Sequence, residues 1–374
     1  GDHRDLHSFP TRRSSDLVVA MSGGVDSSVA AALLIKKGYE VIGIMLKLWA
    51  ADCDLKENAC CTPESISQAR AVAAKLKIPF YVIDAKSDFK KKVVEQFIQS
   101  YQDGLTPNPC FACNQTIKWG FLLERAKQMG VELIATGHYA QIVKDHSGLF
   151  HLLKGADENK DQSYVLSGLT QEQLSRTLLP LGDLQKQEVR DFARSFGLTI
   201  ADKPDSQDLC FVGKDGYRAF LQKYNEISYS SGMILSVDGK VLGEHHGLQN
   251  FTIGQRKGIG SGMGVPMYVV EKDAIRNVLI VGTKEQLGTN RIYAKCINWI
   301  NTAAISEATS LHVKIRYKSK PAKCMISNID NDVVAISLSE LLDDVTPGQI
   351  AVIYNQNEVV GSAIILSSER VQQA

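Results

Sequence analysis

The feature that most constrains the fold is a regular alternation of short apolar runs and helical patterns in the first half of the chain. Apolar runs typical of buried strands lie at 17–21, 39–49, 79–85 and 131–137, with helical stretches between them. This order predicts an α/β domain in which helices cover both faces of a parallel sheet. Ligands of such sheets bind where the strands end, so the residues directly after each run are the first candidates for function.

The character of the sequence changes after about residue 215. The last strong helical pattern of the first half lies at 185–198, and short β-like runs separated by turn signals such as Asp238-Gly239 follow later. Residues 1–16 carry no periodic pattern, and we interpret them as a disordered or non-native tail. The predicted domains are an α/β domain at 17–215, a small β-rich central domain at 216–284 and a second β domain at 285–374.

Composition excludes several classes of protein. The chain has 374 residues, 44% of them hydrophobic, which suffices for several globular domains. A net charge of +1 gives no global field for nucleic acid, so an anionic partner must be met by local patches. No apolar run is long enough to span a membrane, and the polar start does not resemble a signal peptide. Eight cysteines in so long a chain favour a reducing compartment, so we expect a cytoplasmic protein with no membrane partner.

A glycine-rich turn, SGGVDSS at 22–28, follows the first apolar run and enters a helical pattern. Gly23 and Gly24 allow a sharp turn and a close approach to a ligand, and the helix N-terminus directs amides at the same place. Asp26 is a candidate ligand for Mg²⁺ on a bound phosphate. The turn lacks the G-K-[ST] of a Walker A loop and is not G-x-G-x-x-G. On these residues alone, an ordinary strand-to-helix turn stays open.

Two cysteines, Cys110 and Cys113, lie in the stretch TPNPCFACNQTIKWG at 106–120. Their spacing leaves open half of a metal site, a redox pair, a sulfur-handling nucleophile or two thiols near a core. We predict that Asn114 caps a helix that begins at Thr116.

Several motifs together carry a resemblance to a known family. They occur in the order SGGVDSS, NPCFACNQTIK, ATGHYA, KDQSYVL, KPDSQDLCFVG, FTIGQRKGIG and VKIRYKSKP. The first is the signature of the PP-loop ATP pyrophosphatases, and the whole set resembles the tRNA-specific 2-thiouridylases from Val18 to about Ile365. The resemblance implies an adenine nucleotide alpha hydrolase-like N-terminal domain and a C-terminal β-barrel. It also implies an ATP-dependent tRNA-uridine 2-sulfurtransferase, which adenylates the C2 oxygen of wobble uridine 34 and replaces it with sulfur from a cysteine persulfide.

The same resemblance assigns roles to residues. It makes Cys113 the nucleophile and Cys210 the persulfide carrier, which suits a relay that ends in a disulfide between them. The residues implied for ATP binding are Ala20, Met21, Ser22, Gly23, Gly24, Val25, Asp26, Ser27, Leu46 and Gly137. The residues implied for contact with tRNA or its target base are Asn108, Pro109, Cys110, His138, Lys160, Asp161, Gln162, Arg316, Tyr317 and Gln349. The implied cofactors are ATP and Mg²⁺, and the implied partners are the tRNAs for Lys, Glu and Gln and a persulfide donor protein or cysteine desulfurase.

Cys110 departs from part of that family, in which an aspartate precedes the nucleophile by three residues. Two interpretations stay open. Cys110 lines the base pocket, as the aspartate would, or it joins Cys113 and Cys210 as three thiolate ligands of a [4Fe–4S] cluster with one open iron site. We interpret Cys53, Cys60 and Cys61, which lie between a strand and a helix, as structural.

Basic residues mark two further segments. The run KIRYKSK at 314–320 predicts a strand with cations on one face, suited to phosphates, and with Tyr317 stacking on a base. Arg256 and Lys257 in GQRKGIG form a second candidate for phosphate binding. Two other functions remain open on the sequence. A PP-loop synthetase that uses ammonia does not need two cysteines on active-site loops, and a non-catalytic metal- or RNA-binding module does not need SGGVDSS.

Overall fold

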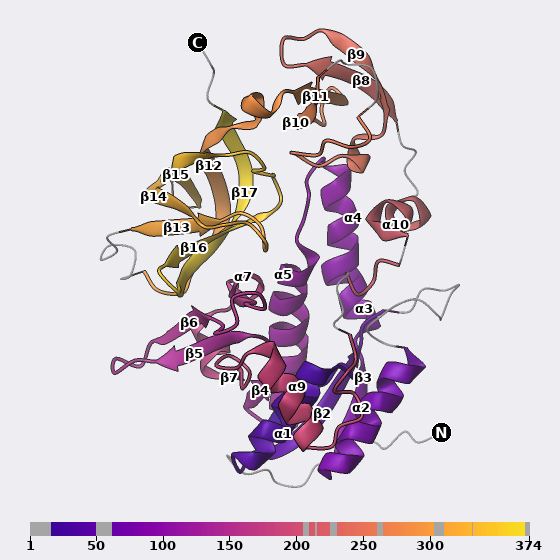
Figure 1. The fold of residues 1–374 in the computed structure, drawn as a ribbon, viewed down its shortest axis with the longest axis vertical. Helices are drawn as coiled ribbons and strands as arrows, with labels where there is room; N and C mark the ends of the chain where they lie inside the picture. Colours follow the sequence, from indigo (N-terminus) through magenta and orange to yellow (C-terminus); the bar gives the residue numbers. More distant parts are fainter. Residues whose placement is uncertain are drawn as a thin grey trace. The chain divides into compact units, whose positions relative to one another are not determined.

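The computed structural model describes residues 16–49, 62–204, 209–213, 215–224, 230–259, 265–302, 310–330 and 332–370. The chain divides into two compact units, one within Gly1–Val93 and Cys110–Lys214 and one within Val94–Pro109 and Asp215–Ala374 (Figure 1). The interpretations of the first 15 residues and of Cys53, Cys60 and Cys61 lie outside the described residues. Asp16, which we assigned to the tail, is instead the first residue of a strand and is buried.

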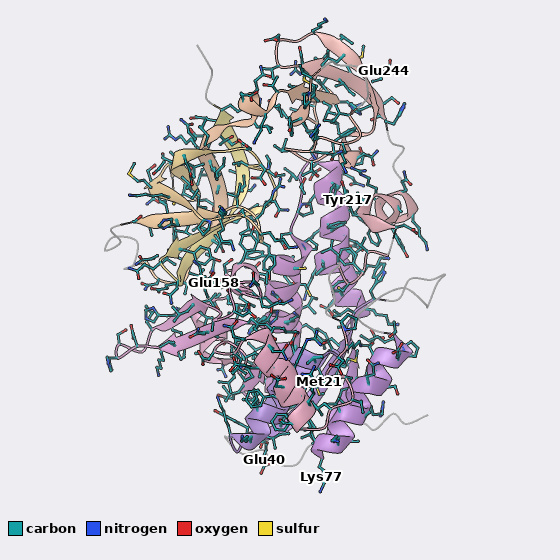
Figure 2. The ribbon with its side chains drawn as sticks, viewed as in Figure 1. Met21, Glu40, Lys77, Glu158, Tyr217 and Glu244 are labelled. Atoms are coloured by element: carbon teal, nitrogen blue, oxygen red, sulfur yellow. The ribbon has the colours of Figure 1, made fainter. Side chains whose placement is uncertain are left out.

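A parallel sheet forms the centre of the first unit, as predicted, and it has a fifth strand that the sequence did not indicate. Its order is β3-β2-β1-β4-β7, and all neighbours run parallel. The strands are β1 (Asp16–Ala20), β2 (Glu40–Lys47), β3 (Phe80–Asp84), β4 (Leu133–Ala135) and β7 (Thr177–Leu178). Leu17, Val18 and Val19 of the central strand are fully buried, and Met21 extends this core (Figure 2).

Helices connect these strands, and one more helix, α9, follows the last of them. They are α1 (Val25–Lys36), α2 (Pro63–Leu76), α3 (Lys86–Phe89), α5 (Pro109–Cys113), α6 (Leu123–Gln128), α7 (Ser163–Leu166), α8 (Gln171–Ser175) and α9 (Lys186–Ser195). A hairpin of β5 (Ala140–Lys144) and β6 (Phe150–Lys154) belongs to the same unit. The predicted start of α2 is confirmed, because the Thr62 hydroxyl accepts a hydrogen bond from the Ser65 amide at 3.1 Å and Pro63 is the first helical residue.

The chain is helical from Pro109 through Cys110 and Cys113 to Gln128. α5 continues without a break into η2 (Asn114–Leu122), a π-helical run that leads into α6. Asn114 therefore lies inside a helix, and its side-chain amide donates to the Val165 carbonyl at 2.9 Å. The prediction that Asn114 caps a helix was wrong, because a distant chain segment takes up its polar group. π-Helical turns are rare and occur often at functional sites.

Among its described residues, the second unit contains two β structures and the α-helices α4 (Glu95–Gln102) and α10 (Gly216–Tyr224). η1 (Lys90–Val94) leads into α4. A four-stranded sheet has the order β10-β11-β8-β9, formed by β8 (Ser231–Ser236), β9 (Val241–His246), β10 (Tyr268–Asp273) and β11 (Val278–Gly282). The short 3₁₀ helices η3 (Leu248–Asn250) and η4 (Lys284–Leu287) flank it in sequence.

Six antiparallel strands of the second unit close into the expected C-terminal barrel. They are β12 (Thr289–Trp299), β13 (Leu311–Lys314), β14 (Ala322–Asn328), β15 (Val333–Leu342), β16 (Ile350–Asn355) and β17 (Glu358–Arg370). The order β12-β15-β14-β13-β16-β17 closes through the pairing of β12 with β17. Buried side chains from every strand fill the interior, among them Ile292, Val313 and Ile353. No helix in the described ranges is long and apolar enough to cross a membrane.

The basic run at 314–320 is not the strand that we predicted. β13 ends at Lys314, and the following residues form a turn. The Ser319 amide donates to the Arg316 carbonyl at 3.1 Å, and the Ser319 hydroxyl accepts from the Arg316 amide at 3.2 Å. A proline at position 321, which cannot donate to a ladder, follows this turn. Arg316 and Tyr317 are therefore presented by a turn.

Candidate functional site

The glycine-rich turn joins β1 to α1 at the carboxyl end of the sheet. Gly23 has φ +74°, and a Cβ on it would lie 2.4 Å from the Ser65 carbonyl oxygen at the start of α2, so no larger residue fits. Gly24 precedes the first turn of α1 in an extended conformation. The Ser27 hydroxyl accepts from the Ser22 amide at 3.2 Å, which fixes the turn across its mouth. The loop therefore holds a helix N-terminus in a preformed concave backbone suited to an anion.

Gly137 follows β4 and touches this loop from the next strand of the sheet. A Cβ at Gly137 would lie 2.7 Å from the carbonyl carbon of Asp26 and from the backbone nitrogen of Ser27. Leu46, the other predicted nucleotide contact outside the loop, lies near the end of β2. Gly137 is thus required for the approach of backbone to backbone, which differs from the ligand contact that the resemblance implies for it.

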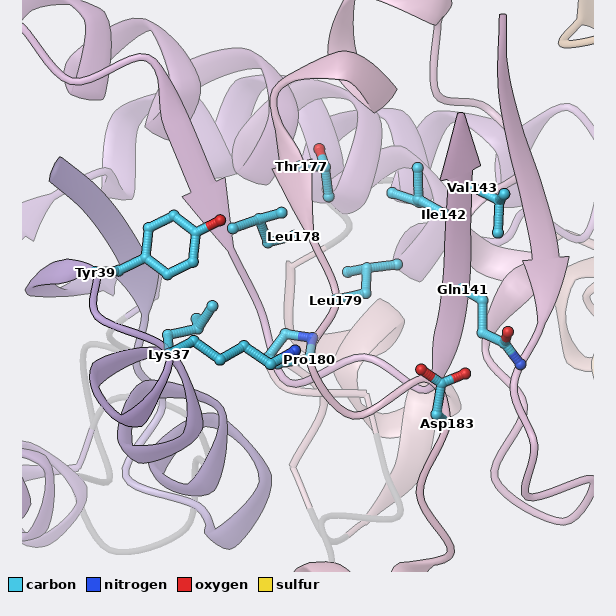
Figure 3. A pocket seen from close by; sticks show the side chains of 11 residues that line it. Lys37, Tyr39, Gln141, Ile142, Val143, Thr177, Leu178, Leu179, Pro180 and Asp183 are labelled. Carbon is cyan, nitrogen blue, oxygen red and sulfur yellow. The ribbon is translucent and has the colours of Figure 1, made fainter. Parts of the chain in front are cut away.

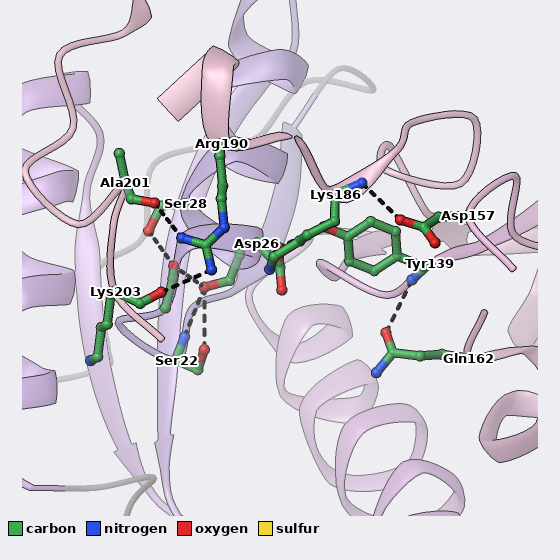
Figure 4. A network of polar contacts seen from close by, with 12 residues as sticks. Ser22, Asp26, Ser28, Tyr139, Asp157, Gln162, Lys186, Arg190, Ala201 and Lys203 are labelled. Carbon is green, nitrogen blue, oxygen red and sulfur yellow. Dashed lines mark hydrogen bonds and ion pairs between the residues drawn. The ribbon is translucent and has the colours of Figure 1, made fainter. Parts of the chain in front are cut away.

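Asp26, in the first turn of α1, is the centre of a polar network (Figure 4). Its Oδ1 accepts from the Tyr139 hydroxyl at 2.8 Å and from the Lys186 ammonium at 2.7 Å. Tyr139 is buried, and Gln162 fixes it by accepting from its backbone amide at 3.1 Å. One carboxylate beside a turn whose backbone suits an anion fits Mg²⁺, which is held by one or two carboxylates together with substrate phosphates. Sequence reasoning did not find Lys186 or Tyr139, because each is more than 100 residues from Asp26.

A second set of cationic groups secures the loop from the segment after α9. The Lys203 ammonium donates to the Gly23 carbonyl at 3.2 Å and to Gln68 Oε1 at 2.5 Å. Arg190 holds this segment in place, because its guanidinium donates to the carbonyls of Ala201 and Lys203 (Figure 4). The glycine loop is therefore lined by ammonium groups, an arrangement that favours a polyanionic ligand.

His138 lies beside this loop in a buried cluster. Its Nδ1 is 2.7 Å from the Thr136 hydroxyl and its Nε2 is 3.2 Å from the Lys118 ammonium. Burial, and then the Lys118 charge, hold the pKa of His138 well below its ordinary value of 6.5. Because an ammonium only donates, Nε2 accepts and the proton of the neutral ring lies on Nδ1. Lys118 comes from η2, so the π-helical run that follows Cys113 also positions this cation.

The three predicted active-site cysteines all belong to the first unit. Cys110 is exposed, Cys113 is buried at the end of α5, and Cys210 is partly buried. Phe211, directly after Cys210, packs edge-on against Phe89 of α3, and α3 in turn contacts η2. Among the described residues, which include all three thiols, no group of three or more metal-binding side chains is placed to hold an ion. The structure thus does not assemble Cys110, Cys113 and Cys210 as cluster ligands.

The KDQ segment is more structural than its polarity suggested. Asp161 is buried, and its Oδ1 accepts from the backbone amides of Gly155 and Ser163 at 3.0 Å each. The Gln162 side-chain oxygen accepts from the Tyr139 amide, and the Gln162 backbone amide donates to the Tyr139 carbonyl. Lys160 and Gln162 are partly exposed. The segment therefore supports the Asp26 network.

Arg316 and Gln349, predicted to contact tRNA, make contacts within the second unit. The Arg316 guanidinium donates to the Ile253 carbonyl at 3.1 Å and to the Thr346 hydroxyl at 2.6 Å, and lies 3.2 Å from Asp344 Oδ2. The Gln349 amide donates to the carbonyls of Thr106 and Pro107. Gln349 thereby holds the chain just ahead of Asn108, Pro109 and the cysteine segment. These bonds give both side chains a structural role.

A pocket of about 320 Å³ lies elsewhere in the first unit (Figure 3). Its lining includes Lys37 and Tyr39 after α1, Gln141 and Val143 of β5, and Asp183. None of the residues predicted for ATP, tRNA or catalysis lines it. The pocket is therefore separate from the candidate site.

Three family models match successive parts of the chain. The model described as the tRNA methyl transferase HUP domain matches residues 15–214. The tRNA methyl transferase PRC-barrel domain matches residues 218–283, and the aminomethyltransferase beta-barrel domain matches residues 289–365. The first match alone covers more than half of the chain.

Curated relatives match nearly the whole length. The tRNA-specific 2-thiouridylase MnmA of Clostridioides difficile (strain 630) is 42% identical over 354 residues, which is 94% of this chain and 98% of that protein. Proteins of the same name from Natranaerobius thermophilus and Geobacter metallireducens are each 44% identical. The former alignment covers 95% of this chain and 98% of the relative, and the latter covers 93% and 96%.

Proposed function

Because this chain belongs to the tRNA-specific 2-thiouridylase family, we propose that it replaces the C2 oxygen of wobble uridine 34 in tRNA by sulfur, with ATP as the activating substrate. The observation that carries the proposal is the SGGVDSS turn, whose backbone and flanking ammonium groups form an anion site at the start of α1. The turn lies at the carboxyl end of a parallel sheet, where ligands of this fold class bind.

The first step is activation of the base. The glycine loop binds the phosphates of ATP, and the amides at the N-terminus of α1 stabilise their charge. Asp26 is the residue that would hold Mg²⁺, which neutralises phosphate charge when it is bound. The C2 oxygen attacks the α-phosphate, pyrophosphate leaves, and the adenylated oxygen becomes a leaving group. The family's activity gives this step, and the geometry of the loop supports it.

The second step is transfer of sulfur. A persulfide on Cys210 attacks C2 with its terminal sulfur, and AMP leaves with the original oxygen. The thiolate of Cys113 then attacks the Sγ atom of Cys210. This attack forms the Cys113–Cys210 disulfide and releases the new sulfur on the base as 2-thiouridine. An external dithiol must reduce the disulfide, and a persulfide donor protein or cysteine desulfurase must reload Cys210.

Further residues hold the substrate tRNA in this proposal. Neutral His138 contacts the target nucleoside, and Cys110, exposed beside the nucleophile, lines the base pocket as aspartate does in relatives. Asn108, Pro109, Lys160 and Tyr317 contact the RNA, and the substrates are the tRNAs for Lys, Glu and Gln. Arg316 and Gln349 act by shaping the RNA-binding surface, since their polar groups are bonded inside the second unit.

Single-turnover release of pyrophosphate tests the activation step apart from sulfur transfer. The purified protein with ATP, Mg²⁺ and unmodified tRNA, and without a persulfide donor, is expected to release pyrophosphate only when the tRNA contains uridine 34. The Cys210→Ser variant should retain the adenylation step, because its hydroxyl replaces a thiol that acts later. Activity with ammonia as the nucleophile and no dependence on tRNA would instead support a synthetase.

A further inference from the structure

We propose that Lys186 is an exchangeable counter-ion of Asp26. Its ammonium neutralises the carboxylate before nucleotide binds, and it moves to a phosphate oxygen of ATP when Mg²⁺ takes that carboxylate. The inference rests on the proposed function, because it requires ATP at the glycine loop. It assigns a role in nucleotide binding to a residue that none of the sequence motifs singled out.

The contact that motivates the proposal is short and sheltered. The Lys186 Nζ atom lies 2.7 Å from Asp26 Oδ1, and the two side chains are 12% and 33% exposed. Charge-assisted bonds of this length are about twice as strong as neutral hydrogen bonds. The Tyr139 hydroxyl donates to the same oxygen, and the Lys186 ammonium lies 5.8 Å from the centre of the Tyr139 ring. The pair therefore has a defined geometry.

The backbone of Lys186 is fixed while its side chain is long. Its amide donates to Asp157 Oδ2 at 2.9 Å, and Gln185 and Glu188 close a capping box around the start of α9. The ammonium is joined to this anchored backbone by a flexible four-carbon stem. An exchange of partner thus needs a change of side-chain rotamer only.

Electrostatics does not favour Mg²⁺ and the Lys186 ammonium on the Asp26 carboxylate at the same time, so one should replace the other. Oδ1 already accepts two hydrogen bonds, and a divalent cation on this carboxylate would repel the ammonium at close range. A triphosphate in the loop gives the displaced ammonium a stronger anionic partner. Lys203 provides a contrast within the same loop, because its ammonium binds two neutral oxygens, those of Gly23 and Gln68.

In an alternative interpretation, Lys186 has only a structural role and links α9 to α1. The two interpretations predict different effects of Mg²⁺ on ATP binding. A tether affects folding stability, whereas a counter-ion competes with the metal for Asp26 and attracts metal-free ATP.

The test measures ATP affinity by titration calorimetry in EDTA and across a series of Mg²⁺ concentrations. Loss of a charged hydrogen bond predicts that Lys186→Met weakens metal-free ATP binding by about tenfold. The same variant should need several-fold less Mg²⁺ for half-maximal enhancement of binding, because the competitor is gone. Asp26→Asn should bind metal-free ATP more tightly than wild type, and adding Lys186→Met should remove most of that gain.

Two further variants control the experiment. Lys203→Met removes an ammonium from the same loop but not from a carboxylate. It is therefore expected to weaken ATP binding with an unchanged Mg²⁺ requirement. Lys186→Arg retains the charge and should keep the affinity for metal-free ATP. It replaces the methionine variant in the test if that variant folds poorly.

An unchanged Mg²⁺ requirement in Lys186→Met, accompanied only by a lower melting temperature, would establish the tether and overturn the exchange. Wild-type protein that fails to bind ATP at all would overturn the proposed function itself, and the exchange with it.

Discussion

Replacing Gly137 with alanine perturbs the place where the end of β4 meets the glycine loop. The added Cβ would lie 2.7 Å from the Asp26 carbonyl carbon and the Ser27 nitrogen, whereas ordinary contact begins at 3.4 Å. The first turn of α1 must therefore move by about 3.4 − 2.7 = 0.7 Å. Both obstructing atoms belong to the backbone, so no side chain can rotate to make room.

The magnitude follows from that displacement. Overpacking of a well-packed site costs about 1–3 kcal/mol of folding stability. A misplacement of about 1 Å in a reacting site lowers rates by about 100-fold. We expect Gly137→Ala to weaken ATP binding and to slow pyrophosphate release by about 10- to 100-fold, on the same basis. The rest of the sheet should stay folded.

Equilibrium ATP binding, measured beside denaturant unfolding, provides the assay. Gly243→Ala is the matched control, because a Cβ at Gly243 meets nothing within 4 Å and should change neither quantity. Gly137→Ala protein with wild-type ATP affinity and wild-type stability would refute the argument that backbone approach at this glycine shapes the site.

Other predictions concern the second unit. Burial lowers the pKa of Lys272 from 10.5 to about 8, and its Nζ atom has no hydrogen-bond partner among the described residues. The charged side chain therefore destabilises the folded state, and Lys272→Met should raise the free energy of unfolding by about 3 kcal/mol at pH 7. Because the neutral amine is favoured in the folded state, the gain in stability should be complete below pH 8 and should vanish as the pH rises toward 10.5. Urea melts at several pH values measure it, and Lys240→Met, at an exposed site, is the control that should show no such trend. Arg316→Ala should lower stability by about 1–3 kcal/mol, because Thr346, Ile253 and Asp344 lose their shared partner. The alternative is that Arg316 contacts a phosphate of tRNA. In that case stability is unchanged, and filter-binding titrations with tRNA would show that the slope of log affinity against log salt falls in magnitude by about one unit.

Local sequence signals predicted much of the fold. β1, the glycine turn and α1 lie where the alternation of apolar and helical patterns predicted them, and Thr62 caps α2 as predicted. Each of these features is specified within a few residues, by turn chemistry, by capping or by apolar period. The β-rich second half was predicted in the same way, and its closure into a barrel came from the resemblance.

Long-range contacts explain what the sequence did not reveal. Asn114 has the composition of a cap, but Val165 takes its amide 51 residues away. The pairing of Asp26 with Lys186 spans 160 residues and depends on how α1 and α9 pack. Arg316 looked like a cation on a strand, but three groups from elsewhere in its unit bind it. Polar side chains show their partners only after the chain has folded.

The most direct test of the central claim is nucleoside mass spectrometry of tRNA incubated with the purified protein, ATP, Mg²⁺ and a persulfide donor. The account predicts 2-thiouridine at position 34 with the wild-type protein, and none with Cys113→Ser or Cys210→Ser, although both variants still bind ATP and tRNA. Serine can neither carry a persulfide nor form a disulfide. Thiouridine formed at the wild-type level by either serine variant would contradict the two-cysteine relay. Unmodified uridine with the fully supplied wild-type protein would contradict the proposed activity.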